Sequence, residues 1–430
     1  MPPITLLAVA NTFLLIGTTV LVSAVAAILI ANLVMFSRNL RYQVADLPAL
    51  DEPEFLRSAV KLLELNLCPG NRVEVLLNGE EAFSAMFRAV EHAKRSITFE
   101  NYIYWSGRVG SDFAQLLAEK ARQGVQVSVL VDWVGAFQMD RAYLRLMRKA
   151  GVEIHRYHPP QRHSLHRFNQ RTHRRELVVD GRIGFTGGVG FGDVWRGDGK
   201  NGWRDNHYRI EGPLVAEMQS IFLDNWLTAS GQVLHGDAYF PALEPCGDQM
   251  AGLIRSRPRE RITAARLSVL MLLRAARRSV HLEQSYFVPD RSLLDALTAA
   301  LRRGVRVEII LPNEKLDYPF VRWASRARWG ALLKAGAKIY EYQPAMLHVK
   351  TVVLDEQWVL TGSANLDYRS FYRNDEILLG VFDQGLARRH LEIFENDRQR
   401  SCLVTLEQWQ NRPAQEKILD FAASLIRTQL

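Results

Sequence analysis

The sequence predicts an α/β protein with two similar domains, each a mixed, mostly parallel sheet flanked by helices, that share one active-site cleft. An N-terminal transmembrane helix precedes them. Three observations support this fold class: strand-like and helical patterns alternate, one block of such elements occurs twice, and the first 36 residues are almost wholly apolar. Strands that alternate with helices are typical of parallel sheets covered on both faces.

The apolar N-terminal segment, residues 4–36, contains no charged residue and exceeds the roughly 20 residues that a membrane-spanning helix needs. We therefore expect a single anchor over residues 1–36. Arg38 and Arg41 follow it, so the positive-inside tendency places the rest of the chain in the cytoplasm. The alternative is a signal peptide cleaved near residues 22–24, but no Lys or Arg precedes the apolar run.

The overall charge predicts an anionic partner. A formal net charge of +8 and a pI near 9.4 suit either nucleic acid or an anionic bilayer, and charge alone does not choose between them. The three cysteines, Cys68, Cys246 and Cys402, form no C-x-x-C pair. Their spacing argues against a disulfide framework or a zinc site and fits a reducing compartment.

The alternation of helices and strands begins after a linker, residues 37–70, that is rich in Pro, Glu and Leu. Gly124 and Gly151 end two of the helices, as C-terminal glycines do. The expected elements are helices over 80–94, 112–122 and 141–150, and strands over 96–104, 125–132 and 152–158.

The second half of the chain repeats this order. Segments 89–105, 116–132 and 146–159 correspond to segments 273–289, 297–313 and 332–344. A duplication of this length predicts two similar domains rather than a solenoid. We place the first domain at residues 71–235, a connector at 236–260, the second domain at 261–402 and an amphipathic tail at 403–430.

The most informative motif lies in the second half, over residues 347–370. His348 and Lys350 are two apart in an apolar strand, so both side chains point into one pocket. Asp355 has the opposite parity and lies in a polar break that reads as a hairpin turn, so it supports the turn. Ser363 and Asn365 follow the next strand and are expected to line the same mouth.

The first half contains an altered copy over residues 172–190. His173, Arg175 and Asp180 have the same spacing, and Asp180 precedes a glycine in a strong hairpin signal. Gly188 corresponds to Ser363. The copy departs from the second one in two places, with Arg175 for Lys350 and Gly190 for Asn365.

Two histidines on facing domains suit a two-step displacement at phosphorus. One imidazole attacks a phosphodiester to form a phosphohistidine, while the other protonates the leaving alcohol and then deprotonates the incoming nucleophile. Arg175 and Lys350 neutralise charge on the phosphate oxygens, and no metal or cofactor is needed. Asp205 and Glu376 are candidates to accept from the second ring nitrogen of each histidine.

Three further residues are candidate substrate contacts. Glu100 and Glu283 occupy matching positions in the repeated strands and either line the cleft or form structural pairs. Arg171 ends a basic loop, residues 162–171, that could hold an anionic headgroup or lie free in solvent.

These motifs resemble the phospholipase D superfamily, whose mark is H-x-K-x4-D twice in a duplicated α/β fold. Within it the chain is most similar to bacterial cardiolipin synthases, in segments 99–105, 202–213, 283–290 and 362–376. The resemblance implies a membrane-bound phosphatidyltransferase of the bacterial inner membrane that joins two phosphatidylglycerols, releases glycerol and binds no nucleic acid. It also implies that Asp205 and Glu376 orient the histidines, and that Asp180 and Asp355 are motif members with a mainly structural role.

Two other readings stay open at this point. A phospholipase D-type phosphodiesterase, or a nuclease, would use the same residues with water as acceptor. A lipid-binding scaffold with a decayed first half-site would account for Arg175 and Gly190. The C-terminal stripe of Ile418, Phe421 and Leu425, with Ala422 and Ile426, either lies on a membrane surface or packs against the body.

Overall fold

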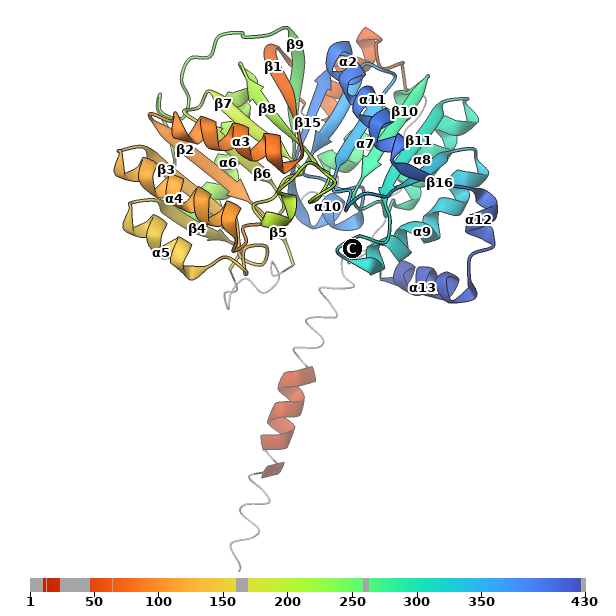
Figure 1. Ribbon diagram of the computed structural model, residues 1–430, viewed down its shortest axis with the longest axis horizontal. Coiled ribbons are helices and arrows are strands. Elements are labelled where there is room, and N and C mark those ends of the chain that lie inside the picture. The colour runs from red at the N-terminus through yellow and green to blue at the C-terminus, as the bar shows by residue number, and fades with distance from the viewer. Residues whose placement is uncertain are drawn as a thin grey trace, which may run out of the picture.

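The computed structural model describes residues 11–12, 14–23, 47–63, 65–159, 169–257 and 263–426. It consists of two α/β halves that lie side by side (Figure 1). Most of the predicted N-terminal anchor lies outside the described residues. Among the described residues, no helix is both long enough and apolar enough to cross a membrane.

The first half contains the elements that its alternating pattern predicts. Its strands are β1 (Cys68–Leu77), β2 (Ser96–Asn101), β3 (Gln126–Asp132), β4 (Glu153–Tyr157), β5 (Arg171–Thr172), β6 (Arg175–Val179), β7 (Ile183–Gly187) and β8 (Asn206–Glu211). Its helices are α3 (Asn78–Glu91), α4 (Arg108–Arg122), α5 (Arg141–Lys149), the short η2 (Asp193–Trp195) and α6 (Leu214–Ser230). The helices and strands expected between residues 80 and 158 are confirmed, although β2 ends earlier, at Asn101.

The second half repeats the order of the first. Its strands are β9 (Gln249–Ser256), β10 (Ser279–Gln284), β11 (Arg306–Pro312), β12 (Lys338–Tyr342), β13 (Lys350–Leu354), β14 (Trp358–Gly362), β15 (Asn374–Phe382) and β16 (Ser401–Val404). Its helices are α7 (Ala264–Ala275), α8 (Arg291–Arg302), α9 (Pro319–Lys334), α10 (Tyr368–Tyr372), α11 (Gln384–Gln399), α12 (Leu406–Gln410) and α13 (Ala414–Leu425).

The two halves share one continuous sheet instead of forming two separate ones. Its strand order is β16-β12-β11-β10-β13-β14-β15-β9-β1-β8-β7-β6-β2-β3-β4. Strand β1 pairs with β8 on one side and with β9 on the other, and β9 pairs with β15. The segment predicted as a connector, residues 236–260, therefore contains a strand at the centre of the sheet.

The expectation of mostly parallel sheets is wrong. The strands β2, β3 and β4 run parallel to one another, as do β10, β11 and β12, and the short β5 runs parallel to β15. The other described pairings are antiparallel. Two of these antiparallel pairings are the motif hairpins, β6–β7 and β13–β14, because a turn of a few residues cannot make the crossover that parallel pairing requires.

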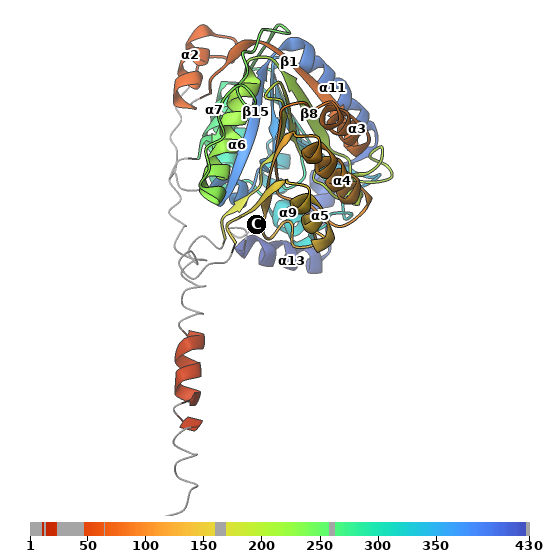
Figure 2. The same ribbon diagram turned by 90° about the vertical axis from the view of Figure 1, so that its left-hand side faces the viewer.

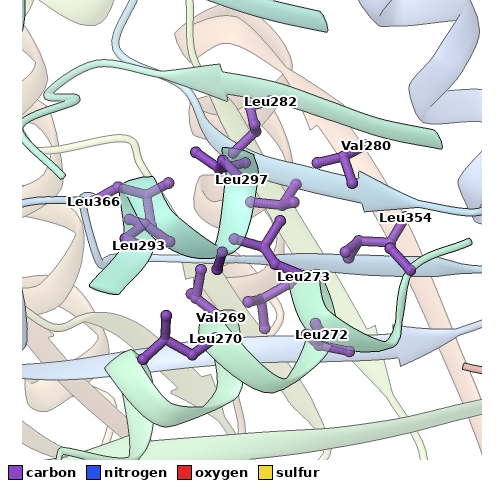
Figure 3. Close-up of a cluster of buried hydrophobic side chains, with 14 of the residues drawn as sticks. Val269, Leu270, Leu272, Leu273, Val280, Leu282, Leu293, Leu297, Leu354 and Leu366 are labelled. Carbon is purple, nitrogen blue, oxygen red and sulfur yellow. The ribbon is translucent and has the colours of Figure 1, made fainter. Parts of the chain in front are cut away.

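Each half buries its own apolar core between helices and sheet. In the second half, leucines and valines of α7 and α8 pack on β10 and β13, among them Val269, Leu297 and Leu354 (Figure 3). The predicted linker also contributes to this core, because α2 (Pro53–Leu62) buries Phe55 and Ala59 there. The last part of the linker is therefore part of the folded body.

Candidate active site

The two motif histidines lie in one cavity between the halves. A cavity of about 430 Å³ is lined by His173, His348, Arg175 and Asn365. Eight aromatic residues complete much of its wall: Tyr102, Trp105, Phe137, Trp195, Trp203, Tyr286, Tyr318 and Phe320. The predicted shared cleft is confirmed, and its walls are both cationic and aromatic.

The backbone before each histidine is held by the opposite half. Strand β5 pairs with the start of β15, and the His173 N–H donates to the Asp375 carbonyl at 2.9 Å. The second half repeats this contact, because the His348 N–H donates to the Arg204 carbonyl at 2.7 Å. Asp375 and Arg204 directly precede Glu376 and Asp205, so the same contact brings each histidine to a carboxylate.

The side-chain pairing is crossed in the same way. Nδ1 of His173 lies 2.9 and 3.0 Å from the two carboxylate oxygens of Glu376. Nδ1 of His348 lies 2.6 Å from Oδ2 of Asp205. An ionised carboxylate only accepts, so Nδ1 carries the proton and Nε2 keeps its lone pair. The sequence identified both carboxylates but not that each serves the histidine of the other half.

The two motif cations lie beside the free ring nitrogens. An Nη of Arg175 is 3.2 Å from Nε2 of His173, and Nζ of Lys350 is 3.2 Å from Nε2 of His348. Nε and Nη1 of Arg175 are buried and have no hydrogen-bond partner among the described residues. Buried donors without partners are costly, so these two N–H groups suit an anionic oxygen in the cavity.

Burial sets the protonation of the histidines. It lowers the pKa of His173 to about 4 and that of His348 to about 3, with Arg175 and Lys350 adding to the effect. Burial also lowers the pKa of Lys350 to about 7. Burial alone would raise the pKa of Glu376 and Asp205, but their histidine partners hold both below the ordinary value. At neutral pH the imidazoles are therefore neutral, as a nucleophile or a general base must be.

Trp195 is a site residue that the sequence analysis missed. Its Nε1 donates to Oδ2 of Asp205 at 3.0 Å, the oxygen that also accepts from His348. A Cβ on Gly190 would lie 2.8 Å from the indole ring of Trp195 and 3.0 Å from Ile103. Gly190 therefore makes room for the indole, which explains one of the two departures of the first motif copy. No periodicity or spacing in the sequence marks Trp195.

Gly188 and Ser363 lie against the carboxylates of Asp205 and Glu376. A Cβ on Gly188 would come within 2.0 Å of Oδ1 of Asp205, so only glycine fits there. At the matching position, the Ser363 hydroxyl donates to Glu376. Asn365 does line the cavity, and it accepts from the Ser285 hydroxyl at 2.7 Å.

Asp180 and Asp355 lie at the hairpin turns, away from the cavity. Both have left-handed backbones, with φ of 54° and 50°. The Asp180 carboxylate accepts from the backbone N–H groups of residues 94–96, and that of Asp355 from those of residues 277–279. Their position agrees with a supporting role at the turns, and among the described residues no contact links these two candidate catalytic residues to the cavity.

Glu100 and Glu283 do not line the cavity, so their prediction as substrate contacts is wrong. Glu100 accepts from Asn225 at 2.7 Å on the face that α6 covers, and burial raises its pKa to about 7. Glu283 is buried beside Asp397 and Arg204. Side chains alternate along a strand, and these two point to the covered face. Arg171 does line the cavity, where it also pairs with Asp132 at 3.1 Å.

Replacing Trp195 with phenylalanine is expected to lower kcat by roughly 10- to 100-fold, the usual worth of a hydrogen bond to a charged group. Steady-state kinetics measures the loss. Trp226→Phe is the matched control, because Trp226 is also fully buried but its Nε1 has no partner in the described structure. Both variants lose packing contacts. Equal effects on kcat would therefore show that the hydrogen bond from Trp195 to Asp205 does not contribute to turnover.

Comparison with known proteins agrees with this geometry. Residues 86–222 and 269–398 match the family model described as cardiolipin synthase, PLD-like domain. The cardiolipin synthase of Geobacillus kaustophilus is 34% identical over 376 residues, which cover 86% of this chain and 75% of the relative. The major cardiolipin synthase ClsA of Bacillus subtilis is 33% identical over 361 residues, covering 83% and 75%.

A solved structure shows the same fold at low identity. The phosphatidylserine synthase of Haemophilus influenzae superposes with a TM-score of 0.69 at 13% identity, covering 87% of this chain and all of that one. The duplicated fold and the paired histidines define a PLD-like enzyme. The chain belongs to the cardiolipin synthase family of PLD-like proteins.

Proposed function

We propose that this protein is a phosphatidyltransferase that joins two phosphatidylglycerols into cardiolipin and releases glycerol. The observation that carries the proposal is the cavity itself, in which each neutral imidazole is oriented by a carboxylate of the other half. The relatives named cardiolipin synthase support the choice of lipid.

The proposed reaction has two displacements at phosphorus. In the first, the anionic phosphate of the bound lipid favours the protonated form of one histidine, which then holds a proton on Nε2 as well as on Nδ1. Nε2 of the other, neutral histidine attacks, the bond between phosphorus and the glycerol oxygen breaks, and the protonated histidine gives that oxygen its Nε2 proton. In the second, the histidine that gave the proton takes the proton of a hydroxyl of the second phosphatidylglycerol. That oxygen bonds to phosphorus as the phosphorus–nitrogen bond breaks, which restores one neutral and one protonated histidine.

Arg175 and Lys350 are proposed to bind the phosphate of the lipid substrate. Arg175 has two unpartnered N–H groups to offer, and its fork can hold two non-bridging oxygens. Lys350 supplies a compact charge on the other side. Because both approach the ring nitrogens that face phosphorus, they stabilise the negative charge where it develops in the transition state.

We also propose that the enzyme works at the bacterial inner membrane, anchored once by residues 4–36 with its catalytic body in the cytoplasm. The uncharged apolar segment and the arginines that follow it support this arrangement. The net charge of +8 favours an anionic lipid surface.

The products of the purified protein test this function. Incubation with labelled phosphatidylglycerol is expected to yield cardiolipin and glycerol in equal amounts, separated by thin-layer chromatography and mass spectrometry. Phosphatidic acid as the main product would instead identify a hydrolase, and no turnover of any donor lipid would leave a binding protein. A variant with both histidines replaced controls for contaminating activity.

A further inference from the structure

The C-terminal helix α13 exposes a stripe of large apolar side chains. Ile418, Phe421, Leu425 and Ile426 are 68%, 65%, 64% and 51% exposed. The spacing of three and four residues puts Ile418, Phe421 and Leu425 on one helical face, and Ile426 directly follows the helix. Soluble surfaces seldom expose such a contiguous stripe without a use for it.

The opposite face fixes the helix in this orientation. Ala423 and Asp420 are buried against α9, and Arg412 donates to Asp420 at 2.9 Å. Arg326 of α9 also donates to Glu416. These contacts fix the orientation of α13 about its own axis, so its apolar stripe points away from the body. The sequence left two alternatives for this tail, packing against the body or contact with a membrane surface. One face of α13 does pack against α9, and the apolar face remains uncovered.

The buried face of α13 packs in a cluster that the cavity wall shares. Ala423 packs in one apolar cluster with Phe320 and Tyr286, and both of these line the cavity with the histidines. Figure 2 shows α13 against α9 at the lower end of the body. Strand β5 and helix α10, which supply Arg171 and Arg369 to the cavity, lie toward the same end (Figure 1).

Two exposed aromatic residues lie at the cavity itself. Phe137 is 71% exposed and Tyr318 is 50% exposed, and both line the cavity from opposite halves. Apolar side chains beside the cavity cannot pair with a charged headgroup. They can contact the acyl chains of the same lipid.

We propose that the stripe of α13, together with Phe137 and Tyr318, docks on the surface of an anionic bilayer and holds the cavity opening against it. An amphipathic helix lies in the interface with its apolar face about 5–10 Å deep. A substrate with two acyl chains could then reach the histidines with its tails still in the membrane. The bilayer is preferred over a protein partner because exposed apolar side chains also line the cavity that receives the proposed lipid substrate, and the net charge of +8 suits anionic lipid. The assignment rests on the proposed lipid substrate.

The first test measures contact with lipid independently of activity. In the full chain reconstituted in phosphatidylglycerol vesicles, Phe421→Cys is expected to react with a water-soluble maleimide at least tenfold more slowly than Val233→Cys. Val233 is 66% exposed and lies outside the stripe. Mass spectrometry separates these sites from the native cysteines. Equal rates overturn the proposal, and so does protection that grows with protein concentration at fixed lipid, which would identify a second copy as the cover.

The second test separates docking from chemistry. The double variant Phe421→Glu/Leu425→Glu is expected to lose roughly tenfold or more of its turnover on vesicle phosphatidylglycerol. On monomeric short-chain phosphatidylglycerol it should stay within about twofold of the unaltered protein, as should the control Leu227→Glu/Val233→Glu on both substrates. Equal losses on both substrates overturn docking. If the unaltered protein turns over neither lipid, the proposed function fails, and the labelling result still decides docking.

Discussion

Replacing His348 with alanine is expected to reduce cardiolipin formation by roughly 10⁴-fold or more, and His173→Ala is expected to do the same. Each displacement uses one histidine as nucleophile or leaving group and the other as proton donor or acceptor. Among the described residues that line the cavity, His173 and His348 are the imidazoles, and the neighbouring cations Arg175 and Lys350 cannot take over both roles. Initial rates with labelled phosphatidylglycerol measure the loss.

His92→Ala is the control for these variants, since His92 is exposed at the end of α3, outside the active-site cavity, and its ring bonds to the Arg88 carbonyl of that helix. It should keep nearly full activity. Thermal unfolding of all three variants separates lost chemistry from lost folding. Near-normal turnover in either His173→Ala or His348→Ala would contradict a mechanism with two histidines.

The local features of the site could be predicted from the sequence because they depend on short-range rules. The spacing of His348 and Lys350 predicted one shared pocket, and the structure places Nζ of Lys350 3.2 Å from Nε2 of His348, although β13 begins only at Lys350. The same parity sets Asp355 apart, and it caps the turn as expected. The internal repeat then identified the partner motif, so two local patterns were enough to predict one shared cleft.

The features that the sequence did not predict depend on contacts far apart in the chain. His173 and Glu376 are 203 residues apart, and His348 and Asp205 are 143 apart. Each pair crosses between halves, and a repeat reveals equivalence but not which copies meet. The continuous sheet was missed for a similar reason, because β9 lies in a segment that its Pro, Gly and charged residues mark as a connector.

The crossed pairing predicts which variants behave alike. Glu376→Gln should impair the step that depends on His173, and Asp205→Asn the step that depends on His348, although Asp205 and His173 belong to the same half. Removing an orienting carboxylate favours the wrong tautomer, so each is expected to lower turnover by roughly 10³- to 10⁴-fold. These losses approach those of the histidine variants and are read from the same initial rates.

A phosphatidyl ester of p-nitrophenol distinguishes the two steps, because this leaving group departs without a proton. The variant that lacks the general acid should still release a burst of p-nitrophenol and accumulate the covalent phosphohistidine, whereas the variant that lacks the nucleophile releases none. Asp205→Asn must then resemble His348→Ala, and Glu376→Gln must resemble His173→Ala. If the variants resemble one another within each half instead, each histidine depends on the carboxylate of its own half, and the crossed contacts have no catalytic role.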